Sequence, residues 1–419
     1  MTITKKEQIG NKVCLTIEMD LELAGTMLEL ENQIATVVNG VGLSLTEEAL
    51  KQQDTSGAPI RVNGHSYTSK GEKKKIFETV YGKVEVSRHV YQSHEGGKIY
   101  VPMEAKSGII GKTTPRFAKI ISHKYAQLTG GQVVDDLEES HNRKVSLDYV
   151  QNVADRVGGI MAGHESEWTY DLPKLKEEVA SISIGVDGAN AMVKHEGWKQ
   201  VMSGTVALYN SECKLLHTIY VANGPESGKK TFYGLMDTEI AAIKNVYPQA
   251  YYVGLADGSK DNWTYLAPHV EATILDFYHV TEHVAIAAKS WFGSQEAAYK
   301  EWLDKAAHDL KNKANGASRL LNEFIKWDKE KPSEAIKNQI TYFQNNRHRM
   351  NYKEYEDKSL PIGSGVTESA CKILVKQRLC GAGMKWTINS IDTVLMARTL
   401  IYSKRWNQFW LNHDTLTTG

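Results

Sequence analysis

The chain has few cysteines, no long apolar run and no net charge. Its four cysteines in 419 residues are far apart and form no CxxC pair, which argues against a disulfide framework and against a thiolate zinc site. No window of about 18 consecutive apolar residues occurs, so we expect no membrane span. The opening MTITKKEQIGNK has no apolar stretch after its lysines and predicts no secretory signal. We therefore expect a cytoplasmic protein without a membrane partner.

The distribution of charge is uneven although 50 Lys and Arg balance 50 Asp and Glu. From Lys311 to the end of the chain, 18 basic residues stand against 10 acidic ones. A basic end segment on a neutral protein is typical of a surface that binds a polyanion. It is equally compatible with an ordinary solvated helical surface, and charge alone leaves both interpretations open.

The first 180 residues show three kinds of pattern. Helical spacing prevails up to about residue 75, and alternating apolar and polar positions over 73–103 then predict a small antiparallel sheet with a turn at EGGK. Residues 133–157 predict a helix, a short polar connection and a second helix capped by Ser146. That is the shape of a helix-turn-helix, which can enter a major groove, but it is also common in helical bundles.

Residues 181–280 predict three strands, a helix, a strand, a helix and a strand, in that order. The strands are expected at 181–189, 198–209, 213–222, 250–258 and 271–280, and the helices at 231–247 and at 261–270, the latter capped by Asp261. This order matches an α/β RNase H-like core, whose mixed sheet places the first strand centrally beside the fourth. From about residue 283 to 360 the pattern is helical and indicates an all-helical insertion.

Two aspartates follow strands that the topology makes neighbours. Asp187 comes after the apolar run SISIGV, where a buried acid would be costly, and Asp257 follows AYYVGLA in the same way. We expect the two carboxylates to lie side by side. Gly188 and Gly258 follow them and would let the backbone turn closely. An aspartate at a strand end is also typical of an ordinary turn or cap residue.

A third acid, Glu368, begins a predicted helix after PIGSGVT. Lys372 and Lys376 follow at i+4 and i+8, near the same helical face. The simpler interpretation is an exposed Glu/Lys pair of small energetic value. Asp276 and His279, in ILDFYHV, form a further acid and histidine pair beside the fifth strand. They are candidates for supporting residues, for a DNA contact or for a structural role, and Asp276 is an alternative second metal ligand.

Three converging carboxylates suit phosphoryl transfer. In-line attack on a DNA phosphodiester develops charge on both the incoming and the leaving oxygen, and two divalent ions stabilise both. Mg²⁺ prefers oxygen ligands and needs few protein carboxylates, and Mn²⁺ takes similar sites. The residue pattern therefore predicts two Mg²⁺ or Mn²⁺ ions held by Asp187, Asp257 and Glu368.

Several segments resemble the catalytic domain of bacterial insertion-sequence DDE transposases, most closely the ISKra-type family. They are GVDGA, LADGSKDNW, LDFYHVTEH, PIGSGVTESACKILVKQRLCGAGMKW and RWNQFW. The resemblance extends over about residues 180–410 and, loosely, over 75–180. It implies Asp187, Asp257 and Glu368 as the catalytic trio, and Asp276 with His279 is similar to the acid-x-x-His signature of Mutator-like and hAT-like transposases.

The resemblance also implies partners. The partners are double-stranded DNA, both as terminal inverted repeats and as target, and a second copy of the chain bound to the paired ends. We expect an enzyme associated with the nucleoid, whose DNA contacts are Lys372, Lys376, Arg378 and Lys385. From the residue patterns we expect an α+β region at 1–110, a helical domain at 111–175 that is a candidate helix-turn-helix for DNA binding, a catalytic domain at 176–282 and 361–419, and the helical insertion at 283–360. The alternatives are an RNase H-like nuclease without strand transfer and a domesticated DNA-binding regulator.

Overall fold

The computed structural model describes residues 2–10, 12–22, 24–93, 96–97, 99–165 and 167–418. The chain divides into two compact units, one formed by residues 1–170 with 407–419 and the other by residues 171–406. Within the described ranges, no helix is long and apolar enough to cross a membrane. The candidate site lies in the second unit, so the first unit is described briefly.

The first unit begins with a hairpin that the sequence patterns did not indicate. Strands β1 (Thr2–Ile9) and β2 (Lys12–Glu18) pair antiparallel. Helix α1 (Met27–Gln52) follows and starts with a capping box in which Thr26 and Glu29 each bond the other's backbone N–H. An antiparallel sheet is present as predicted, but it consists of β3 (Ile60–Val62), β4 (His65–Glu78) and β5 (Lys83–Ser93), so β3 and most of β4 lie in the stretch that was expected to be helical. Its β4–β5 turn lies at 79–82, and the expected EGGK turn falls partly outside the described residues.

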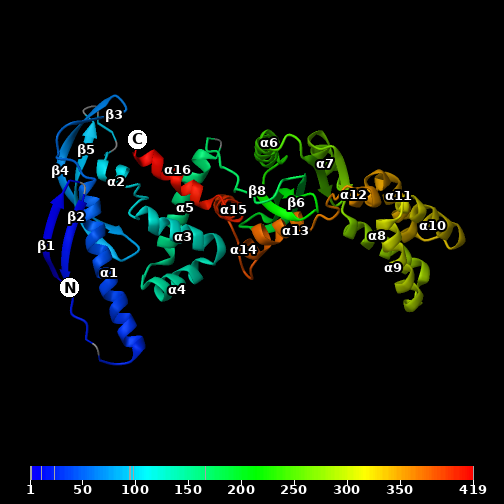
Figure 1. Ribbon diagram of the computed structural model, residues 1–419, viewed down its shortest axis with the longest axis horizontal. Coiled ribbons are helices and arrows are strands. Elements are labelled where there is room, and N and C mark those ends of the chain that lie inside the picture. The colour runs from blue at the N-terminus through cyan, green and yellow to red at the C-terminus, as the bar shows by residue number, and fades with distance from the viewer. Residues whose placement is uncertain are drawn as a thin grey trace. The chain divides into compact units, whose positions relative to one another are not determined.

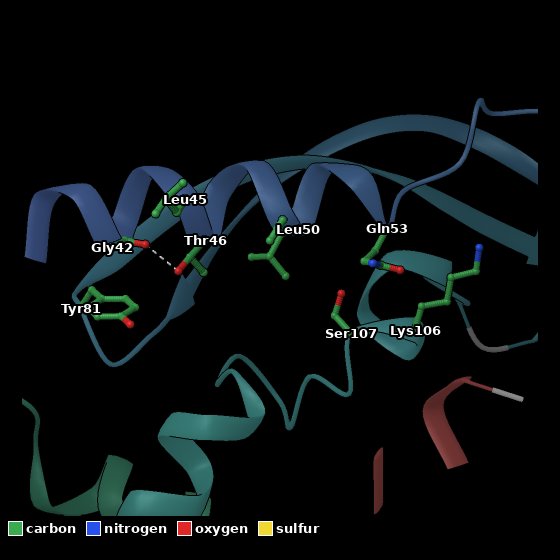
Figure 2. A pocket seen from close by; sticks show the side chains of 9 residues that line it. Gly42, Leu45, Thr46, Leu50, Gln53, Tyr81, Lys106 and Ser107 are labelled. Carbon is green, nitrogen blue, oxygen red and sulfur yellow. Dashed lines mark hydrogen bonds between the residues drawn. The ribbon is translucent and has the colours of Figure 1, made fainter. Parts of the chain in front are cut away.

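A hollow of about 430 Å³ opens beside α1 (Figure 2). Gly42 lies in its wall close to the Tyr81 ring, and a Cβ atom at this position would come within 2.5 Å of that ring. The opposite wall includes Lys106 of the short helix α2 (Pro102–Lys106). The lining consists of Gly42, Leu45, Thr46, Ala49, Leu50, Gln53, Tyr81, Lys106 and Ser107. It holds one ionisable amine and no acid, so it offers no arrangement for catalysis.

The remainder of the first unit is helical. It contains α3 (Pro115–Gln127), α4 (Gly130–His141), α5 (Leu147–His164) and most of α16 (Trp406–Thr418). The predicted pair of helices is confirmed as α4 and α5, and the Ser146 hydroxyl accepts the Tyr149 N–H at 3.2 Å to cap α5. Arg143 in the connection is buried and donates to the Glu78 carboxylate at 2.6 Å. DNA binding by this pair stays a prediction.

The second unit is built on a five-stranded mixed sheet. Its strands are β6 (Ser181–Val193), β7 (Gly197–Tyr209), β8 (Leu215–Asn223), β9 (Tyr251–Ala256) and β10 (Ala272–Leu275). The order is β10-β9-β6-β7-β8, with β6, β7 and β8 antiparallel and β6, β9 and β10 parallel. The predicted central position of the first strand beside the fourth is confirmed.

Helices cover both faces of this sheet (Figure 1). On one face lie α6 (Lys230–Val246) and α7 (Lys260–Leu266), where a Cβ at Gly204 would meet the Met236 sulfur at 2.3 Å. On the other lies α13 (Gly365–Ala370), continued by the π-helical segment η3 (Cys371–Lys376) and α14 (Gln377–Leu379). The 3₁₀ turn η1 (Ala267–His269) follows α7, and α15 (Ile388–Tyr402) packs against β8.

The helical region runs from α8 to α12. It comprises α8 (Phe277–Phe292), α9 (Glu296–Asn312), α10 (Gly316–Glu330), α11 (Glu334–Asn346), the 3₁₀ turn η2 (Arg347–Arg349) and α12 (Tyr352–Asp357). Aromatic packing holds it together, as in the stack of Trp291 on Trp327 with ring centroids 5.2 Å apart. A long helical region after the sheet was predicted, and it is present.

Three local expectations were wrong. The fifth strand ends at Leu275 and residues 277–280 are helical, because Asp276 accepts a backbone N–H and caps α8. Asp187 lies within β6, which continues to Val193, although pairing with β9 stops at Gly185. Helix α7 is preceded by Ser259 rather than capped by Asp261, which lies in its first turn.

Candidate active site

Three aspartates occupy one level of three neighbouring parallel strands. The β6–β9 register runs residue for residue to the pair Gly185 and Leu255, so two residues further along Asp187 and Asp257 share a level. The β9–β10 register ends at Ala256 and Leu275, so Asp276 is level with Asp257. Neighbouring strands are separated by about 4.8 Å. The prediction that the strands of the first two acids are neighbours is therefore confirmed, although Asp187 lies within β6 rather than after it.

Asn262 in α7 joins the ends of β6 and β9. Its side-chain amide lies 3.4 Å from the Val186 carbonyl and 3.4 Å from the Asp257 carboxylate. The exposed Asp257 carboxylate also accepts the Ser259 N–H at 3.2 Å. Gly258 has a φ of +109°, the left-handed region that favours glycine, and lets the chain turn sharply here.

Gly188 does not have the role expected for it. It continues β6 in regular pairing with Met202. A Cβ at this position would meet the Gln200 amide nitrogen at 2.4 Å, so a side chain already fills the space above it. Its backbone N–H donates to the Asp187 carboxylate at 2.7 Å. Gly188 therefore leaves no opening for a phosphate on that side.

Helix α13 lies directly on β6 at Gly185. A Cβ at Gly185 would come within 2.0 Å of the Thr367 hydroxyl oxygen, so only glycine permits this approach. The same hydroxyl bonds to that of Thr205, which pairs with Gly185 across β6 and β7, at 2.8 Å. Because side chains alternate along a strand, Asp187 points to the same face as Gly185. The helix is thus held on the face that carries Asp187.

Cys371 contacts Asp187 one helical turn after Thr367. Its thiol is buried. Burial, the nearby negative charge of Asp187 and a hydrogen bond to that carboxylate raise the pKa of the Cys371 thiol to about 12. Further along, the Cys380 thiol lies 3.2 Å from the Asn190 carbonyl, and Trp386 bridges to Val193. The segment from Thr367 to Trp386 therefore follows β6 along its length.

Glu368 is linked to Asp276 through Ser364. The Ser364 hydroxyl donates to the Glu368 carboxylate at 2.9 Å, and the Ser364 N–H donates to the Asp276 carboxylate. Since Ser364 and Glu368 are four residues apart, they lie on the same side of the helix. The exposed Glu368 therefore lies on the side of α13 where Asp276 is found.

Asp276 is fully buried and satisfied by backbone donors. Besides the Ser364 N–H, its carboxylate accepts the His279 N–H at 2.6 Å, and its own N–H donates to the Ala256 carbonyl at 3.0 Å. The neighbouring Phe277 N–H donates to the Ile362 carbonyl at 2.9 Å. Asp276 thus joins β9, α8 and the entry to α13, and this geometry favours the supporting role over that of second metal ligand.

His279 begins a cluster that the sequence patterns did not reveal in full. Its Nε2 lies 3.3 Å from that of His283, whose ring stacks on Tyr342 of α11 with centroids 3.7 Å apart. Burial lowers the pKa of His283. Burial, with the charges of Asp257 and Asp276 nearby, raises the pKa of Tyr342. The i, i+4 spacing of the histidines was a readable signal, whereas nothing local marked Tyr342, Asn262 or Cys371.

The four predicted DNA contacts differ in their surroundings. Lys372, Lys376 and Lys385 are exposed on the segment that carries Glu368. Arg378 is 3% exposed, and its guanidinium lies over the Trp386 ring at 4.7 Å. Arg378 is therefore a packing residue in this structure, because a buried, stacked guanidinium is not presented to a phosphate.

The elements that carry the acids converge, but the carboxylates are engaged by the protein. Among the residues that the structure describes, no three His, Cys, Asp or Glu side chains lie close enough to hold a metal ion. The acids accept hydrogen bonds from neighbouring groups instead, as described for Asp187, Asp257 and Glu368. These partners include flexible side chains and exposed backbone, so rotation about the side-chain torsions would free the oxygens. Their chemistry suits a hard cation.

Comparison with known proteins does not add to this site. No protein-family model matches the chain. A search of curated proteins found no significant match. A functional assignment therefore depends on the residues and their geometry.

Proposed function

We propose that the protein is a DNA transposase of an insertion sequence, with an RNase H-like catalytic unit and a DDE active site formed by Asp187, Asp257 and Glu368. The observation that carries the proposal is the common level of Asp187 and Asp257 on adjacent parallel strands, with the helix of Glu368 seated on β6 at Gly185. The strand order of the sheet and the resemblance of the catalytic segments to ISKra-type transposases support it.

The proposed reaction consists of two successive displacements at phosphorus. In the first, water forms a bond to phosphorus at the element end, the bond from phosphorus to the 3′ oxygen breaks, and that oxygen takes up a proton. In the second, the freed 3′-OH forms a bond to a target phosphorus and loses its proton, and the target's own 3′ oxygen is displaced and takes up a proton. Both steps develop charge on the entering and the leaving oxygen.

Two Mg²⁺ or Mn²⁺ ions, when bound, would supply electrostatic stabilisation of both oxygens. Asp187, on the central strand β6, would contribute to holding both, and Asp257 and Glu368 would each contribute to one. Asp276 would keep β9, α8 and α13 in register, because its carboxylate and N–H join all three. Lys372, Lys376 and Lys385 would hold the DNA backbone beside the site.

The experiment uses purified full-length protein and DNA carrying the inverted repeats that flank its coding sequence. Replacing Asp187 by Asn removes a charged ligand with little change of volume. We expect Mg²⁺-dependent cleavage to fall by on the order of 10²–10³-fold or more while DNA binding is retained. The matched control is Asp304→Asn, an exposed acid of α9, which should cleave as the wild type does.

A pre-cleaved end distinguishes the alternatives. A transposase joins the free 3′-OH of such an end to target DNA, whereas a hydrolytic nuclease of the same fold gives no joined product. A domesticated regulator binds the repeats and neither cleaves nor joins. Full cleavage by the Asp187→Asn protein would contradict the assignment of the site.

A further inference from the structure

A histidine pair on α8 has an arrangement that the proposed transposition chemistry does not use. His279 and His283 are four residues apart and therefore project from one face of the helix. Their Nε2 atoms lie 3.3 Å apart, and the two ring planes are nearly perpendicular at 84°. The His279 side chain is 38% exposed, so this edge of the pair is open to solvent.

The second ring nitrogen of each histidine, Nδ1, lies near an oxygen that can accept a hydrogen bond. Nδ1 of His283 faces the Gln339 carbonyl oxygen at 2.7 Å, and Nδ1 of His279 lies 3.5 Å from the Glu282 carboxylate. An acceptor at Nδ1 favours the tautomer with its proton there, which leaves a lone pair on Nε2. With both protons on Nδ1, two lone pairs face each other at this separation and a cation between them would remove their repulsion, whereas a proton on one Nε2 would make an N–H···N hydrogen bond instead.

The separation matches a shared metal ion. With zinc-to-nitrogen bonds of about 2.0–2.1 Å and tetrahedral angles, two imidazole nitrogens on one ion are about 3.3–3.4 Å apart. A hydrogen bond from Nδ1 to an oxygen is the arrangement that orients metal-binding histidines. The Tyr342 ring, stacked on His283 with an interplanar angle of 16°, further fixes the plane of that imidazole.

We propose that His279 and His283 form a binding site for a borderline divalent cation of the Zn²⁺ class, with both Nε2 atoms as ligands and water completing the coordination. No third His, Cys, Asp or Glu of the described residues joins them, so the site is a two-ligand chelate. Imidazole nitrogen selects Zn²⁺, Ni²⁺ or Cu²⁺ over Mg²⁺. The site is thus distinct in chemistry from the carboxylate site and does not depend on it.

The test measures Zn²⁺ binding to the chelator-stripped full-length protein by competition with a chromophoric zinc indicator, in excess Mg²⁺. His279→Asn and His283→Asn should each weaken the tightest site at least ~10-fold, since each removes one of two ligands. Gln339→Leu retains both ligands but removes the acceptor at Nδ1, and it should weaken binding by about 10-fold or more. The circular dichroism spectrum of the His279→Asn protein should be unchanged, because His279 is at the surface.

Two controls separate this site from others. His308→Asn alters an exposed histidine of α9 and should leave the affinity unchanged. Asp187→Asn should also leave it unchanged, which separates failure of this inference from failure of the proposed catalytic site. The inference is overturned if the wild type competes for no zinc, or if His279→Asn and His283→Asn bind zinc as the wild type does.

Discussion

The parallel and antiparallel halves of the sheet in the second unit carry different side chains at the level of Asp187. On the parallel half, this level carries Asp276, Asp257 and Asp187. On the antiparallel half, the register continues the row to Ser203 and then Ala222, which are small and uncharged. Ser203 and Ala222 are buried, as Asp276 is, so burial alone does not explain where the acids occur.

The availability of donors explains the difference. On the parallel half, β9 and β10 end and the chain turns into helices, which frees backbone N–H groups such as those of Ser259, His279 and Ser364 for the carboxylates. On the antiparallel half, β7 continues past Ser203 and its N–H groups are used by the ladders to β6 and β8, whereas β8 ends at Asn223. Asp257 and Asp276 therefore lie where strands end and backbone donors are free, and Asp187, within β6, accepts the Gly188 N–H.

The largest effect is expected when an acid is placed on the antiparallel half of the sheet. Ser203→Asp would place a carboxylate at a position with 0% exposure, beside Asp187 and without a free donor. We expect a loss of about 4 kcal/mol in the free energy of unfolding, measured by urea denaturation. Ser203→Ala is the control and should stay within about 1 kcal/mol of the wild type, since it removes one hydroxyl group, whose neighbour is the Cys371 thiol. If Ser203→Asp and Ser203→Ala were equally stable, the two halves of the sheet would not differ in their tolerance of an acid.

A smaller loss is expected from Asp276→Asn on the parallel half. Asparagine keeps the size but turns one acceptor oxygen into an NH₂ group, which would face a backbone donor. We expect a decrease of about 2–3 kcal/mol in the free energy of unfolding, because a buried charge-assisted bond is replaced by two opposed donors. Asp304→Asn, on the exposed face of α9, is the reference. If the urea midpoint of Asp276→Asn equalled that of Asp304→Asn, the Asp276 carboxylate would not hold β9, α8 and α13 together.

The smallest effect concerns the contact between α13 and β6. Gly185→Ala places a methyl group where the Thr367 hydroxyl lies, and we expect a cost of about 1–3 kcal/mol. Adding Thr367→Ala removes the clash, so the double variant should recover part of the loss in a double-mutant cycle. Gly234→Ala in α6, with nothing within 4 Å, should instead stabilise by about 0.4–1 kcal/mol. Additive losses at residues 185 and 367 would mean that the helix does not rest there.

Apolar periodicity predicted the order of the elements in the second unit, because strands and helices leave different repeats in the sequence. It also placed Asp187 and Asp257 next to one another once the sheet order was inferred. It did not predict that β6 continues past Asp187, because that continuation depends on pairing with β7 rather than on local sequence. The β1–β2 hairpin was missed although Val13, Leu15 and Ile17 alternate with less apolar residues along β2, because β1 has few apolar positions.

The sequence by itself determined which residue types stand at the strand ends, and in what order the strands and helices follow, since these depend on local spacing. Tertiary structure alone decided that Asp276 binds the Ser364 N–H, that Cys371 meets Asp187, and that Tyr342 reaches His283. Each of these contacts joins positions far apart in the chain or depends on the packing of a helix against the sheet, and no local pattern of side chains encodes such a meeting.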